Sequence, residues 1–132
     1  MPVIKICMYK VVHSSGKREI CNAIQDSIKE SLNITHDNFH HRIFEFDEEH
    51  LFIPPGKSKK YISIELDLFP GKTREQKLKM FKMIETGLLK FNIQKDDILI
   101  IYREPALEDW FIRGSTAYEL HQDLSTKADD RD

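Results

Sequence analysis

The sequence predicts an α/β fold of the α+β kind: two β-α-β units that form one four-stranded sheet, with both helices on one face. Three observations support this prediction. Short segments alternate apolar and polar residues as strands do, two longer segments repeat apolar residues at helical spacing, and the order of these elements occurs twice along the chain.

The first unit covers residues 2–46. VIKICMY (3–9) has the apolar and β-branched content of a strand, and a helix follows for which Ser14 or Ser15 can supply the N-cap. Its second strand is predicted in FHHRIFEF, residues 39–46. The apolar residues of the helix recur every four positions, at Ile20, Ile24, Ile28 and Leu32.

The second unit covers residues 61–104. YISIELDLF (61–69) alternates as a strand, a turn follows, and Thr73 with Gln76 forms a capping-box pair at the start of the next helix. DILIIYRE (97–104) is predicted as the last strand of the sheet. The apolar stripe of the helix consists of Leu78, Phe81, Ile84, Leu88 and Phe91.

The two units also end their helices alike. The pattern N-I-x-x-D occurs at 33–37 and again at 92–96, and the same offset separates Glu45 from Glu104. We interpret this as an internal duplication, the alternative being coincidence between two common helix endings. The expected organisation is a single domain over 1–124, with repeats at about 2–46 and 61–104 joined by a loop, and a polar tail at 125–132.

With both helices on one face, the other face of the predicted sheet is left exposed to solvent. Architectures of this kind and size often bury such a face against other subunits, so the fold argument predicts an oligomer. The stretch from Trp110 to Leu124 is expected to form short turns or an arm onto a neighbouring subunit.

Composition excludes several classes of function. The 20 basic and 22 acidic residues nearly balance, so the net charge of the chain does not attract nucleic acid or an anionic membrane. No apolar stretch is long enough to span a membrane.

Two cysteines without a signal peptide favour a reduced, cytoplasmic setting with free thiols. A redox role for Cys7 or Cys21 lacks a partner motif. A metal site is not expected, since the adjacent His40 and His41 point to opposite faces of a strand.

The opening residues, MPVIKI, contain a candidate catalytic group. Removal of Met1 would leave Pro2 with a secondary amine held at the start of a strand. In an apolar pocket the neutral amine can remove a proton next to a carbonyl, and beside a carboxylate the cation can donate one. The structural alternative is a proline that merely starts a strand, where its missing N–H costs nothing.

Other segments add weight to the catalytic interpretation of Pro2. These are DNFH at 37–40, LFPGKTREQK at 68–77, EDW at 108–110 and RG at 113–114. In this order the chain resembles the tautomerase superfamily, with its 4-oxalocrotonate tautomerase-like fold, and more closely the longer-chain branch that includes malonate semialdehyde decarboxylase. The resemblance covers most of the chain.

This resemblance implies a role for each matched residue. Pro2 falls on the catalytic proline, and Asp37 on an aspartate that orients or activates a water or tunes the proline amine. Lys72 falls where an arginine of the family grips the carboxylate of the substrate. Trp110 falls on a tryptophan of the pocket wall, and Tyr118 lies near another aromatic residue of that wall. The resemblance further implies a homotrimer that needs no cofactor.

The chain departs from the family pattern at three positions within the quoted segments. Asn38 stands where the family usually has arginine, and Pro70 stands where the decarboxylase has a second arginine. The ammonium of Lys72 is a point charge, whereas the guanidinium of an arginine binds a carboxylate through two parallel hydrogen bonds. The start of a helix also provides backbone N–H groups for an anion. Keto–enol isomerisation of a small oxo-acid is therefore the expected activity. The alternatives are decarboxylase or hydratase chemistry, or an inactive oligomeric binding module.

Overall fold

The computed structural model describes residues 2–10 and 16–123 and contains one four-stranded sheet. Its strands are β1 (Val3–Tyr9), β2 (His40–Phe46), β3 (Ile62–Asp67) and β4 (Ile98–Arg103), in the order β2-β1-β3-β4. β1 runs parallel to β2, β3 runs parallel to β4, and the two central strands β1 and β3 are antiparallel. The predicted fold class is confirmed, with strand ends within one or two residues of the expected ones.

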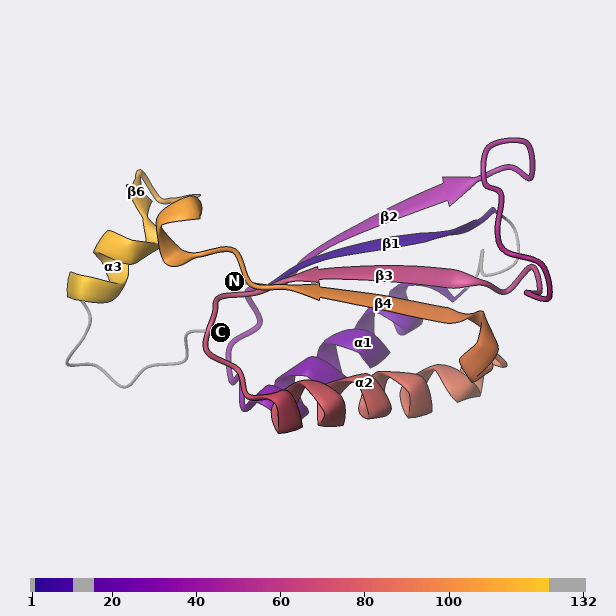
Figure 1. Ribbon diagram of the computed structural model, residues 1–132, viewed down its shortest axis with the longest axis horizontal. Helices are drawn as coiled ribbons and strands as arrows, with labels where there is room; N and C mark the ends of the chain where they lie inside the picture. Colours follow the sequence, from indigo (N-terminus) through magenta and orange to yellow (C-terminus); the bar gives the residue numbers. More distant parts are fainter. Residues whose placement is uncertain (1, 11–15, 124–132) are drawn as a thin grey trace.

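Both long helices, α1 (Lys17–Leu32) and α2 (Arg74–Leu88), lie side by side under one face of the sheet (Figure 1). Each connects two parallel neighbouring strands, as a β-α-β crossover does. The core lies between the helices and the sheet, where strands and helices contribute fully buried aliphatic side chains, among them Ile4, Ile6, Ile24, Ile28, Ile62, Ile64, Leu66, Ile84 and Leu88.

The capping box at the start of α2 is present as predicted. The Thr73 hydroxyl accepts a hydrogen bond from the Gln76 backbone N–H at 3.1 Å, and the Gln76 side chain accepts one from the Thr73 N–H at 2.9 Å. α1 begins at Lys17 after Gly16, whereas the expected caps Ser14 and Ser15 lie outside the described residues.

Replacing Thr73 with alanine is expected to lower the free energy of unfolding by about 1 kcal/mol, because an N-cap hydroxyl satisfies an N–H that the helix itself leaves unpaired. Urea denaturation followed by circular dichroism measures this loss. Thr86→Ala, an exposed threonine within α2, is the matched control and is expected to have no destabilising effect. Equal losses in both variants would contradict a specific capping role.

Asparagines in left-handed conformation end the helical segments of both units. Asn33 follows α1 with φ 57°, and Asn92 follows the short 3₁₀ helix η1 (Leu89–Phe91) with φ 61°. Asparagine tolerates this conformation better than most residues, which makes it a suitable helix terminator. A second 3₁₀ helix, η2 (Lys95–Asp97), then leads into β4. The internal duplication stays a prediction.

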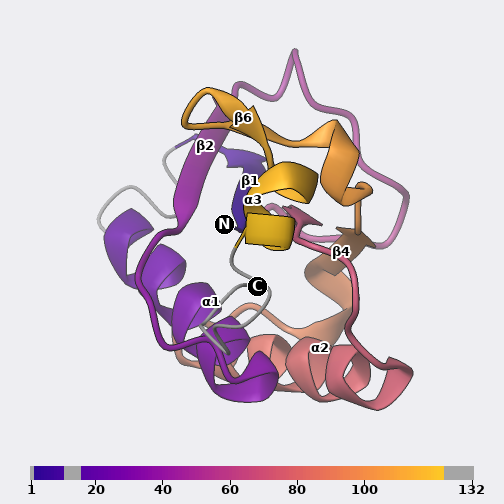
Figure 2. The same ribbon diagram turned by 90° about the vertical axis from the view of Figure 1, so that its left-hand side faces the viewer.

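The C-terminal segment extends beyond one end of the sheet (Figures 1 and 2). It contains η3 (Leu107–Asp109), β5 (Phe111–Ile112), β6 (Ser115–Thr116) and α3 (Ala117–Asp123), which pack mainly on one another. Where short turns or an arm were expected, the segment thus forms a short strand pair and a helix of seven residues. Within the described residues no element covers the second face of the sheet. On that open face Phe44, Leu99 and Ile101 each expose about two-fifths of their surface.

Within the described ranges, the structure contains no helix of the length and apolarity that crossing a membrane requires.

Candidate functional site

The residues predicted for the site come from connections at one end of the sheet. Because β1 is antiparallel to β3, the start of β1 lies beside the end of β3, with Val3 opposite Asp67. The end of β4 lies beside them, with Asp67 opposite Arg103, and so does the start of β2, with Val3 opposite His40. The C-terminal segment stands beyond this same end (Figure 2).

Pro2 immediately precedes β1, a central strand, and is buried. Its carbonyl oxygen accepts a hydrogen bond from the His40 N–H at 3.0 Å, which fixes its position against the start of β2. By the order of the strands, Pro2 is flanked on one side by the connection that carries Asp37 and on the other by the connection that carries Lys72.

Asp37 lies three residues before His40, in the connection between α1 and β2. Its carboxylate accepts hydrogen bonds from two α1 side chains, the Lys29 ammonium and the Gln25 amide, the latter at 3.3 Å. The bond from Lys29 and then the charge of its ammonium lower the pKa of Asp37. Asp37 is therefore a carboxylate at neutral pH, able to accept protons or hydrogen bonds but not to serve as a general acid.

Lys72 lies in the connection between β3 and α2, just before the Thr73 cap, and is half-buried. The backbone here differs from the expectation for an open anion site. The Lys72 N–H donates to Glu104 Oε2 at 3.2 Å, and the Thr73 and Gln76 N–H groups are occupied by the capping box. These three N–H groups are already paired with side chains of the chain itself.

Glu104 is the residue of this region that sequence reasoning missed. One of its oxygens accepts from the Lys72 N–H and from the Tyr102 hydroxyl at 3.1 Å, and the other accepts from the Lys77 ammonium at 3.4 Å. Its side chain is only 20% exposed. The internal repeat is the sequence signal that could have indicated this role of Glu104. Its equivalent in the first unit, Glu45, accepts a hydrogen bond from the Lys17 ammonium at 3.0 Å, near the start of α1.

The two aromatic candidates have different surroundings. Trp110 is half-buried, donates its indole N–H to the Pro105 carbonyl at 3.1 Å, and meets the Phe69 ring edge-on with 5.0 Å between ring centroids. Phe69 follows β3 at the end of the sheet where Pro2 lies, so Trp110 is fixed near that end. Tyr118, on α3, is 44% exposed.

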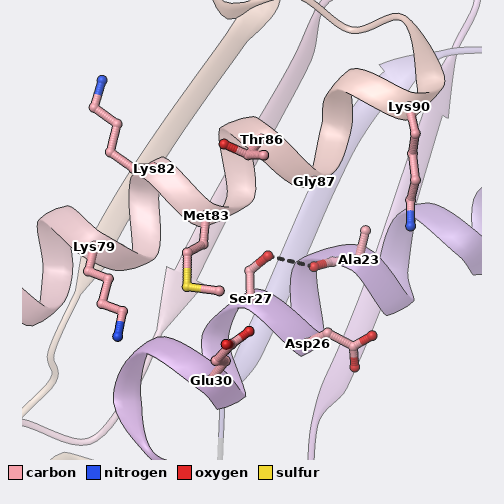
Figure 3. Close-up of a pocket in the computed structure, with 10 residues that line it drawn as sticks. All are labelled: Ala23, Asp26, Ser27, Glu30, Lys79, Lys82, Met83, Thr86, Gly87 and Lys90. Carbon is pink, nitrogen blue, oxygen red and sulfur yellow. Dashed lines mark hydrogen bonds between the residues drawn. The ribbon is translucent and has the colours of Figure 1, made fainter.

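A shallow groove of about 440 Å³ lies elsewhere, between α1 and α2 (Figure 3). The helices approach closely there: a Cβ on Gly87 would lie 3.6 Å from Ser27 Oγ. Acidic side chains line it from α1 and lysines from α2. None of the predicted site residues lines this groove, which makes it a feature of the helix layer distinct from the candidate site.

The cysteines and the histidines that the structure describes have no arrangement that indicates a site. Cys7 and Cys21 are free thiols, and burial raises the pKa of both, which keeps them protonated. Within residues 2–10 and 16–123, no three histidine, cysteine or acidic side chains gather as metal ligands would.

Comparison with known proteins identifies the family. A family model described as "Tautomerase enzyme" matches residues 37–113, which is more than half of the chain and includes Asp37, Lys72 and Trp110. This chain belongs to the tautomerase family. The resemblance inferred from the sequence is thereby confirmed.

Solved structures similar to this tautomerase share its fold over nearly their whole length. A malonate semialdehyde decarboxylase, FG41, inhibited by 3-bromopropiolate, matches with TM-score 0.79 and 22% identity over 93% of this chain and 98% of its own. A second malonate semialdehyde decarboxylase matches with TM-score 0.80 and 16% identity over 92% and 98%. Native fused 4-OT matches with TM-score 0.79 and 15% identity over 89% and 98%.

Proposed function

We propose that this tautomerase isomerises a small oxo-acid between its keto and enol forms, with the amine of Pro2 moving the proton. The observation that carries this proposal is the position of Pro2, buried between the connections that carry Asp37 and Lys72. Family membership supports it further.

The chemistry needs one group that can both take and return a proton. The neutral amine of Pro2 removes a proton from the carbon next to the carbonyl, the electron pair moves to the carbonyl oxygen, and the ammonium so formed returns the proton to that oxygen. In the reverse direction the same group acts first as an acid. Lys72 holds the substrate carboxylate, Asp37 orients a water or the proline amine, and the aromatic rings of Trp110 and Tyr118 keep water out.

The decisive experiment compares two forms of the same chain. One begins at Pro2 and the other retains Met1, whose peptide bond turns the ring nitrogen into an amide without a basic lone pair. Intact mass verifies each form, and phenylpyruvate and a 2-hydroxymuconate-type dienol serve as substrates. We expect turnover only by the chain that begins at Pro2. Equal rates would remove the Pro2 amine from the mechanism.

Decarboxylation or hydration of a small oxo-acid is a second candidate, favoured by the two malonate semialdehyde decarboxylases among the similar structures. The same pair of chains, incubated with malonate semialdehyde, tests the decarboxylation through release of carbon dioxide. Absence of turnover on every substrate by a correctly processed chain would favour the third interpretation, an inactive oligomeric binding module.

We further propose that the chain forms a homotrimer through the open face of its sheet. The exposed side chains of Phe44, Leu99 and Ile101 on this face supply apolar surface, and the ion pairs of Arg103 with Glu65 and Asp67 supply polar contacts beside it. Four of the similar structures are fused 4-OT trimers, two of them symmetric and two asymmetric.

Replacing Ile101 with aspartate is expected to convert the trimer into monomers, because each interface would then bury a carboxylate without a partner. Sedimentation velocity measures the change. Leu78→Asp is the matched control, since Leu78 is 56% exposed on α2, away from the open face, and this variant is expected to remain trimeric. A monomeric wild-type chain, or a trimeric Ile101→Asp variant, would contradict this mode of assembly.

A further inference from the structure

We infer that Gln25 and His41 are positioning residues for Asp37, arranged as a chain of hydrogen bonds from the sheet through α1 to the carboxylate. This inference rests on the proposed function in one respect, namely that Asp37 takes part in the reaction. The contacts themselves join described residues of α1, of β2 and of the connection between them.

Asp37 needs such support because of where it lies. It belongs to a connection between α1 and β2, and its side chain is 76% exposed, so no packing restricts its rotation. Its hydrogen-bond donors, Gln25 and Lys29, stand one helical turn apart on the same face of α1. Lys29 supplies charge through a long flexible stem, while Gln25 supplies a planar amide whose direction a second partner can fix.

That second partner is His41. The Gln25 amide lies between two groups, with its nitrogen 3.3 Å from Asp37 Oδ1 and its oxygen 2.9 Å from His41 Nε2. An ionised carboxylate only accepts hydrogen bonds, so the Gln25 group that faces Asp37 must be the NH₂. The amide oxygen then faces His41 and can only accept, which requires His41 Nε2 to carry a proton.

The other ring nitrogen of His41 is consistent with this assignment. Nδ1 is buried and has no hydrogen-bond partner, as expected for the unprotonated nitrogen of a neutral imidazole. Burial, followed by the charges of Arg18 and His40, lowers the pKa of His41, which also favours the neutral ring. The direction of each hydrogen bond is therefore set by the carboxylate at one end of the chain.

His41 is itself firmly placed. It lies in β2 opposite Ile4 of β1, on the side of the sheet that faces the helices, and its ring stacks on Phe39 with 6.3 Å between centroids and 16° between planes. A ring held by the sheet thus orients an amide on α1, and that amide orients the exposed carboxylate. This explains how a residue of a connecting segment can keep the fixed geometry that proton-transfer chemistry needs.

The first test reads the hydrogen-bond chain without reference to activity. Nitrogen-15 NMR of the full chain at neutral pH reports which nitrogen of His41 carries the proton. We expect the Nε2–H form in the wild type and a mixture of both forms in Asp37→Asn, whose amide can donate as well as accept. Gln94→Glu, at an exposed glutamine whose side chain caps nothing, is expected to resemble the wild type. An Nδ1–H ring in the wild type, or no change in Asp37→Asn, would overturn the inference.

The second test measures the effect on the reaction. Gln25→Glu keeps the shape of the side chain and the oxygen facing His41 but places a second carboxylate against Asp37. We expect kcat/KM to fall about tenfold or more, mainly through kcat, with the pH profile shifted because the pKa of Asp37 rises. Gln94→Glu, with the same change of charge, is expected to retain the wild-type value.

The two tests separate two kinds of failure. If the wild type shows no turnover, the proposed function fails, while the NMR result still decides whether Gln25 links His41 to Asp37. If turnover is present and Gln25→Glu matches Gln94→Glu in kcat/KM and pH profile, the positioning role is wrong and the proposed function stands.

Discussion

Replacing Lys72 with methionine is expected to lower kcat/KM for a carboxylate substrate by roughly 30-fold to a few thousand-fold. Removal of one partner of a buried charge pair costs about 2–5 kcal/mol, and each 1.4 kcal/mol is about a factor of ten. The large effect is expected because the N–H groups of Lys72, Thr73 and Gln76 are already bonded to Glu104 and within the capping box. They offer a bound carboxylate no second anchor once the ammonium is gone.

Two further variants make this prediction specific. Lys79→Met removes an exposed lysine from α2, the helix that follows Lys72, and is expected to leave the kinetics unchanged. Lys72→Arg restores the charge with a different shape and is expected to recover most of the loss in kcat/KM. Steady-state kinetics on phenylpyruvate measures all three variants. A Lys72→Met enzyme with wild-type kcat/KM would show that the substrate carboxylate binds elsewhere.

Replacing Leu88 with alanine is expected to lower the free energy of unfolding by about 2–5 kcal/mol. Leu88 is fully buried where α2 ends against the core, and truncation removes apolar contacts and leaves a cavity that the packed neighbours fill only partly. A loss of this size is a large share of the total stability of a domain of this length.

Leu78→Ala is the matched control, since it makes the same substitution in the same helix at a side chain that is 56% exposed. We expect its cost to stay below about 0.5 kcal/mol. Urea denaturation of both variants at one fixed protein concentration measures the difference, because the stability of an oligomer depends on concentration. Similar losses in the two variants would place the core somewhere other than between the helices and the sheet.

The parts of the fold that local rules govern were predictable from the sequence. β1 occupies the expected residues, and the Thr73 capping box forms as its spacing indicates. Both features depend on residues within a few positions of one another, where periodicity and capping preferences are most informative.

The details of the site depend on contacts between residues far apart in the chain. Glu104 reaches the Lys72 N–H across 32 positions, and nothing in either segment alone indicates that contact. The same holds for His41, whose link to Gln25 requires knowing that β2 lies above α1. Sequence reasoning could name candidate residues here, but not which backbone groups were already occupied.

The occupied N–H groups at the start of α2 have a consequence for selectivity. A ligand held by a rigid fork or by backbone amides must fit one fixed spacing between its anchor and its reacting carbon. In the proposed function the anchor is Lys72, and a lysine carries its charge at the end of four methylenes, which suits acids of different length better than a fixed fork does. We therefore expect this protein to accept a homologous series of oxo-acids with gently varying efficiency, in place of a sharp preference for one.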